Sequence, residues 1–246
     1  MNTLKSVLAW LLEPTNWLGP AGILARLGEH VVLSVAVLAV VVALAVPLGA
    51  WVGHTRRGQT WLAALTNVSR ALPTLGLVSL CALWLGIGLR APFIALAALA
   101  LPSVLLATAA GTAAVSPVVV EAARALGHTP LQVWWRVELP LSLPVLLGGI
   151  RNAALQVVAT ATIAAYVADV GLGRFIFTGL KTHDYAQMAG GSLLLIALAL
   201  VTGAGLSLLS WPVSRWAGAA ARAGKADAAR PASAQRPATP GRRADV

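Results

Sequence analysis

Three polar side chains at a regular spacing stand out from a sequence that is mostly apolar. Asn152, Gln156 and Thr160 recur every four residues, which places them on one face of a helix. Neutral amide and hydroxyl groups at such positions can line a pathway for a solute or form hydrogen bonds with a neighbouring helix. We favour the pathway, because a neutral polar lining suits a zwitterion or a cation that is passed on rather than held tightly.

Pro73 is a second candidate for the same pathway. It lies in the segment Arg70-Ala71-Leu72-Pro73-Thr74, and proline removes a backbone donor, which frees a carbonyl and favours a kink. A kink of this kind can face a polar pathway, and it can equally be a packing feature at the start of a helix. Both interpretations of Pro73 stay open.

The sequence lacks the patterns of common catalytic and metal sites. The four histidines lie far apart and have no carboxylate or second histidine at a metal-ligand spacing. No Gly-x-Ser-x-Gly nucleophile motif occurs. The Gly224-Lys225 pair is followed by Ala226, where an ATP-binding loop needs Ser or Thr. We therefore expect no catalytic residue, no metal site and no cofactor bound by this chain, which makes an intramembrane enzyme the weaker class.

A short polar insert, VEAARALGHTPLQVWWRVELP, occupies residues 120–140. Ser116-Pro117 predicts the start of a helix and Gly127 predicts its end in a left-handed conformation. Thr129-Pro130 predicts a second short helix that stops near Leu139-Pro140. Residues 116–140, called the insert from here on, are thus expected to form a helix-turn-helix that presents small alanines to a partner. The alternative is a loop that lies on the membrane with its tryptophans among the headgroups.

The elements around this insert must be membrane helices. The chain is 58% hydrophobic and 11% charged, with a mean hydropathy of +0.80, and a helix needs about 20 apolar residues to cross a membrane. We predict an all-α polytopic protein with five spans, or six at most, and note that the second could begin near Trp61. The five are Val31–Gly53, Leu72–Leu89, Ala91–Val115, Leu141–Val167 and Met188–Trp211.

Three regions divide the chain. Residues 1–30 contain charges and prolines among apolar residues and are expected to be interfacial. Residues 31–215 form the transmembrane part, in which Gly49 and Gly53 have the small-residue spacing that allows close helix packing. Residues 216–246 are rich in Ala, Arg, Pro and Gly and are expected to be a disordered basic tail that contacts lipid.

The distribution of basic residues predicts the orientation of the chain. The net charge of +10 could suggest nucleic acid, but the charges gather in alternate loops, as the positive-inside rule requires. Arg56 and Arg57, the insert, and the C-terminal tail fall on one side if there are five spans. We therefore predict an external N-terminus, a cytoplasmic C-terminus and no nucleic-acid partner.

The insert resembles the EAA loop of binding-protein-dependent ABC transporter permeases. Val137 stands where that pattern has Ile. The matching positions are Glu121, Ala122, Ala123, Gly127, Val137, Leu139 and Pro140. The resemblance covers roughly residues 25–215 and implies an ABC importer permease (type I) fold in a bacterial inner membrane. It also implies three protein partners: an ATPase subunit that binds this loop and uses the ATP, a second identical or related permease, and an external solute-binding protein.

Two further segments resemble one subgroup of that family. Arg70 to Thr74 and Gly171-Leu172-Gly173-Arg174-Phe175-Ile176 are similar to permeases for the osmoprotectants glycine betaine, choline and carnitine. Methionine permeases share the second segment, so a permease for methionine or another small solute remains an alternative. A membrane scaffold that binds a cytoplasmic partner without moving solute is the other. The solute, the pairing of permeases and the role of the tail are not determined by the sequence.

Overall fold

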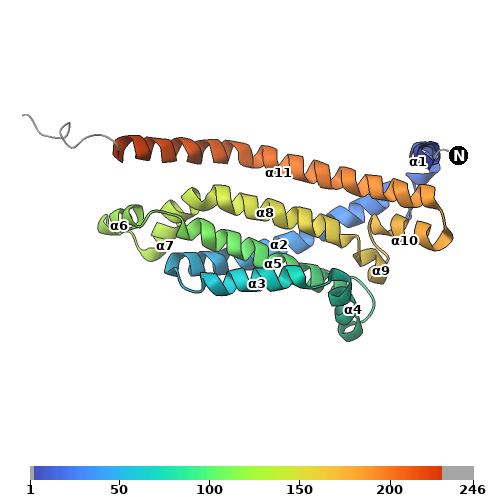
Figure 1. The fold of residues 1–246 in the computed structure, drawn as a ribbon, viewed down its shortest axis with the longest axis horizontal. Helices are drawn as coiled ribbons and strands as arrows, with labels where there is room; N and C mark the ends of the chain where they lie inside the picture. Colours follow the sequence, from blue (N-terminus) through green and yellow to red (C-terminus); the bar gives the residue numbers. More distant parts are fainter. Residues whose placement is uncertain (1–2, 229–246) are drawn as a thin grey trace, which may run out of the picture.

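The computed structural model describes residues 3–228, and within this range every regular element is a helix. The long helices α2, α5, α8 and α11 run along the length of the molecule, with α6 and α7 at one end and α1, α9 and α10 at the other (Figure 1). The elements are α1 (Thr3–Leu12), η1 (Pro14–Asn16), α2 (Ile23–Thr55), α3 (Gln59–Ala71), α4 (Thr74–Leu85), α5 (Arg90–Ala113), α6 (Pro117–Ala125), α7 (Pro130–Val133), η2 (Trp134–Glu138, a π-helical turn), α8 (Leu139–Ala161), α9 (Ala164–Ala168), α10 (Gly173–Thr182) and α11 (Tyr185–Ala228).

The prediction of an all-α membrane protein is confirmed. Four helical segments of the described chain are long and apolar enough to cross a membrane: 23–55, 90–113, 130–161 and 185–213. A fifth span arises if α3 and α4 are counted together. The chain is therefore a multi-pass membrane protein with four or five spans.

The second predicted span, Leu72–Leu89, is wrong as a single helix. α3 and α4 meet at an angle of 88°, and α4 has 12 residues, too few to cross a membrane. Leu72 is extended, with φ −71° and ψ 127°, because the ring of Pro73 disfavours a helical conformation in the residue before it. Pro73 is therefore the break between two helices and not a kink inside one.

Two other predicted boundaries also move. The first span begins at Ile23 rather than Val31, because the polar residues of its first turns have partners in the α9–α10 loop and do not interrupt the helix. The fourth predicted span, Leu141–Val167, ends at Ala161. There the N–H of Ile163 bonds to the carbonyl of Thr160, three residues back, and a turn leads into α9.

The tail predicted to lack structure from residue 216 is helical through Ala228. Its alanines explain the difference, since alanine has the highest helix propensity of the common residues. Residues 229–246, the rest of that predicted tail, lie outside the described part of the chain. At the other terminus, α1 packs on α11, where the ring of Trp10 lies over Gly190.

Glycines bring α2 and α8 into close contact with α5, where Gly49 and Gly53 of α2 face its backbone and Gly149 of α8 faces the Ala107 methyl group. A Cβ on Gly49 would lie 2.6 Å from the carbonyl oxygen of Leu105, and one on Gly53 would lie 2.6 Å from that of Ala109. Gly149 of α8 contacts Ala107 of α5 in the same way. The small-residue spacing seen in the sequence thus marks real helix contacts, as expected where helices pack by shape rather than by hydrophobic force.

Replacing Gly149 with Ala is expected to destabilise the bundle, because the new Cβ would overlap the side chain of Ala107. The expected loss is about 1–3 kcal/mol, the usual cost of overpacking, and it would lower the midpoint of thermal unfolding in detergent. Gly148→Ala is the matched control, since a Cβ there meets nothing within 4 Å. Equal midpoints for the two variants would show that the α5–α8 contact is not tight.

Candidate functional site

The first helix of the insert and the start of its second helix form where the sequence predicts them. α6 begins at Pro117 after Ser116, although the Ser116 side chain makes no capping hydrogen bond. Gly127 ends the helix with φ +87°, a conformation that glycine adopts without strain. Thr129 starts α7 with a capping box, in which its hydroxyl and the Gln132 side chain each bond to the other's backbone N–H.

The insert has a small apolar core of its own. Val115, Val120, Ala123 and Val133 are buried together, and Val137 packs against them. Of the predicted Glu-Ala-Ala motif, Ala123 therefore faces inward, whereas Glu121 and Ala122 are exposed. Ala123 therefore packs α6 against the core of the insert, while Glu121 and Ala122 are left on its exposed face.

The outer surface of the insert is unusually apolar for an exposed loop. Val118 is 72% exposed, Leu126 is 80% exposed and Leu131 is 66% exposed. They belong to α6, the turn after it and α7, which lie at one end of the molecule (Figure 1). Exposed apolar groups around a small-residue helix form a surface suited to a protein partner.

The second helix of the insert does not stop near Leu139-Pro140, so that prediction is wrong. Helical backbone runs without a break from Pro130 to Ala161, through one π-helical turn at Trp134–Glu138. Pro140 follows the π-helical turn directly, and because proline has no N–H it removes one backbone hydrogen bond from the continuous helix. Leu139 and Pro140 are half-buried, and the insert is thereby joined directly to a membrane helix.

Polar contacts that the sequence analysis missed tie the insert to the end of α2. Nδ1 of His54 lies 2.7 Å from Oε2 of Glu138, and Nε2 of the same ring lies 3.3 Å from Nη2 of Arg124. Arg56 donates a hydrogen bond of 2.9 Å from Nη2 to the carbonyl of Val115. These pairs are far apart in sequence and show no periodicity, so the sequence carried no signal for them.

The predicted pathway residues do not share one role. Gln156 is half-buried, and its amide reaches α5, donating to the carbonyl of Leu99 at 3.3 Å and accepting from Ser103 at 3.4 Å. Thr160 donates to the carbonyl of Gln156 in its own helix at 2.7 Å. Asn152 and Pro73 are exposed. Gln156 thus follows the helix-packing alternative, while contact with a solute stays a prediction for all four residues.

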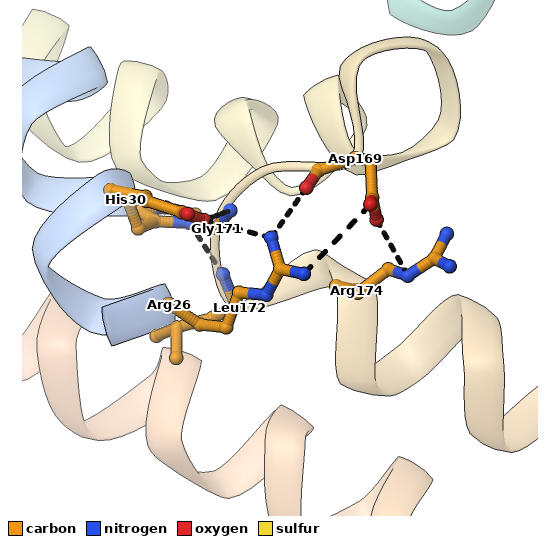
Figure 2. A network of polar contacts seen from close by, with 7 residues as sticks. Arg26, His30, Asp169, Gly171, Leu172 and Arg174 are labelled. Atoms are coloured by element: carbon orange, nitrogen blue, oxygen red, sulfur yellow. Dashed lines mark hydrogen bonds and ion pairs between the residues drawn. The ribbon is translucent and has the colours of Figure 1, made fainter. Parts of the chain in front are cut away.

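A second polar network lies at the opposite end of the molecule. Figure 2 shows Arg26 reaching from α2 to Asp169, which Arg174 approaches from the other side. Arg26 donates to the backbone carbonyl of Asp169 and pairs with Glu29 at 3.0 Å. Arg174 pairs with Asp169 at 2.7 Å. Asp169 is therefore held by two arginines, one from α2 and one from α10.

The same network holds the Gly171-Leu172 backbone. Glu29 accepts a hydrogen bond from the N–H of Gly171 at 2.9 Å, and Nδ1 of His30 accepts one from the N–H of Leu172 at 3.3 Å. The other ring nitrogen of His30 lies 2.9 Å from the carbonyl of Val158. His30 is 1% exposed and joins α2, α8 and the loop before α10.

No group of three or more metal-ligating side chains occurs among the described residues. The arrangement instead consists of a helical bundle, an exposed apolar insert at one end and a hydrogen-bonded loop at the other. Such a site can bind a protein partner and transmit movement.

The fold of the chain is similar to that of a solved ABC transporter chain. The chain is similar to the structure titled as an inward-facing conformation of the MetNI methionine ABC transporter, with a TM-score of 0.69, 22% identity, and coverage of 82% of this chain and 98% of that one. More specifically, residues 45–212 match the family described as binding-protein-dependent transport system inner membrane component. The chain belongs to this family, and the resemblance based on its EAA loop is confirmed.

Two curated relatives are more similar to the chain in sequence. The carnitine transport permease protein OpuCB of Listeria monocytogenes is 31% identical over 189 residues, which cover 77% of this chain and 87% of the relative. The choline transport system permease protein OpuBB of Bacillus subtilis (strain 168) is 30% identical over 173 residues, which cover 70% and 80%. The first relative is named as a permease for carnitine and the second as a permease for choline.

Replacing Gly171 with Ala is expected to destabilise the outer network. Gly171 has φ +76°, and a Cβ there would lie 2.9 Å from Nδ1 of His30, displacing the acceptor of the Leu172 N–H. We expect a loss of about 1–3 kcal/mol from strain and the broken hydrogen bond, measured by thermal unfolding. Gly58→Ala, with φ +84°, ψ 6° and open space around it, controls for the strain of a left-handed backbone alone. A loss no larger than in that control would contradict the role of His30.

Proposed function

We propose that the chain is the permease subunit of an importer for a quaternary-amine osmoprotectant, namely glycine betaine, choline or carnitine. The observation that carries the transport role is the exposed insert, which is folded on its own core and continuous with a membrane helix. The choice of solute is supported by the names of the two curated relatives. Their family likeness covers most of this chain, which favours a shared class of solute.

The insert is the proposed contact with a cytoplasmic ATPase subunit. Glu121 and Ala122 face outward beside Val118 and Leu126, so an apolar groove on the partner would bury this surface and pair with the carboxylate. ATP is then bound and hydrolysed by the partner, and this chain contributes no catalytic group and no cofactor site. Closure of two ATPase subunits would push two such inserts and switch the pathway between outward-open and inward-open states.

The remaining partners and the orientation follow from the same arrangement. A second permease, identical or related, would complete the pathway, and a solute-binding protein would deliver the solute at the end that carries α1, α9 and α10. The C-terminal part of α11 extends toward the end that carries the insert (Figure 1). This placement supports a cytoplasmic C-terminus and an external N-terminus, in agreement with the distribution of basic residues.

Charge reversal in the insert is expected to release the ATPase subunit. In a mild-detergent pull-down from the native host, Glu121→Lys should recover about tenfold less ATPase than the unchanged chain, the effect of losing about 1.4 kcal/mol at the interface. Gly127→Val should act similarly, because a β-branched residue is strained at φ +87°. Glu13→Lys, an exposed charge reversal before η1, is the control. Recovery of the permease without any ATPase would favour a scaffold.

The solute is expected to be a methylated amine. Cells that depend on this chain for uptake should take up radiolabelled glycine betaine, choline or carnitine, and at least one of these compounds should compete with the others. Deletion of the chain should remove that uptake, and the unchanged chain should restore it. Uptake of methionine, with none of the three amines competing, would contradict the proposed solute while leaving the permease role intact.

A further inference from the structure

One imidazole ring joins the insert to the first membrane helix. His54 lies in the last turn of α2, where its Nδ1 contacts Glu138 of the π-helical turn at 2.7 Å. Its Nε2 contacts Arg124 of α6 at 3.3 Å. His54 is 84 positions from Glu138 and 70 positions from Arg124 in the sequence. The ring therefore connects both helical parts of the insert to α2.

Burial makes the contact with Glu138 a strong one. Glu138 is 4% exposed, and a carboxylate withdrawn from water is costly unless a partner supplies a hydrogen bond or a charge. The side chain of His54, itself 21% exposed, provides that partner. Removing His54 would leave a buried carboxylate unpaired, an effect far larger than the loss of a surface ion pair.

The two neighbours of the ring differ in what they can donate and accept. Arg124 has donors and no acceptor, so Nε2 accepts a hydrogen bond from it. Nδ1 is then the ring nitrogen that donates to the carboxyl group of Glu138.

We propose that His54 is a positioning residue that transmits movement of the insert to α2. The inference rests on the proposed function, since the movement is the one that the ATPase partner would impose. Arg56 holds the carbonyl of Val115, where the insert begins, and Glu138 lies where the insert ends. The end of α2 is therefore tied to both ends of the insert. We call the connected side chains of Arg124, His54 and Glu138 the relay. A displaced insert must either carry α2 with it or break this relay.

The test measures solute imported per ATP hydrolysed by the full complex, in vesicles supplied with its ATPase and binding protein. His54→Leu and Glu138→Leu should each lower this ratio by about tenfold, equivalent to about 1.4 kcal/mol of coupling. Both should leave recovery of the ATPase subunit unchanged, because the exposed face of α6 is intact. The double variant should match the single variants, since the two residues act through one contact.

Two matched variants separate coupling from folding. His54→Gln should restore the ratio, because an amide offers one donor and one acceptor in place of the ring nitrogens. Thr55→Val should behave as the unchanged chain, since the Thr55 hydroxyl bonds within its own helix to the carbonyls of Trp51 and Val52. Arg124→Leu leaves no buried charge unpaired and covers the case in which the variants at His54 or Glu138 fold poorly. Because Arg124 is itself exposed on α6, its ratio is measured on complexes that have retained the ATPase, and it should again be lower.

Several outcomes would overturn the relay. One is an unchanged ratio in His54→Leu, and another is a His54→Gln variant as impaired as His54→Leu. Release of the ATPase subunit from a folded His54→Leu complex would also overturn it, by showing that His54 merely shapes the docking surface. An unchanged chain that imports no solute would overturn the proposed function and the relay with it, so the two failures are distinguishable.

Discussion

Close packing of α2 and α8 on α5, made possible by glycines, is the constraint on which the rest of this structure depends. Lipid is as apolar as the side chains, so no hydrophobic force drives these helices together, and they associate by close packing. Gly49 and Gly53 admit the backbone of α5, while Gly149 admits Ala107 from the other side. The three helices form one packed unit. The insert at one end and the loop before α10 at the other are positioned relative to that unit.

At both ends of α2, polar side chains form hydrogen bonds with a loop that is distant in sequence. At one end Glu29 and His30 accept hydrogen bonds from the backbone at Gly171 and Leu172. At the other end His54 contacts Glu138 and Arg56 reaches the carbonyl of Val115. Polar side chains near the ends of a span can be costly in lipid, and here they have partners in the loops that the bundle must hold.

Signals local in sequence predicted structure well, and contacts between distant residues left no such signal. Ser116-Pro117, Gly127 and Thr129-Pro130 each mark the helix end that the structure shows, because caps and proline act on the nearest turn. The bend at Pro73 was underestimated as a kink, although the restriction on Leu72 was readable from the sequence. His54 and Glu138 could not be paired in advance, since one sequence contains no trace of contacts across 84 residues. The pathway residues remain a prediction, because a solute surface depends on a second chain.

The unbroken helix from Pro130 to Ala161 has a mechanical consequence. Its 32 residues span about 48 Å, and it carries part of the insert at one end and reaches the outer loops at the other. If it moves as one piece, a helix of that length acts as a lever, so that a tilt of about 5° about one end displaces the other by about 4 Å. The helix is unbroken at Pro140, so no loop separates the insert from the span.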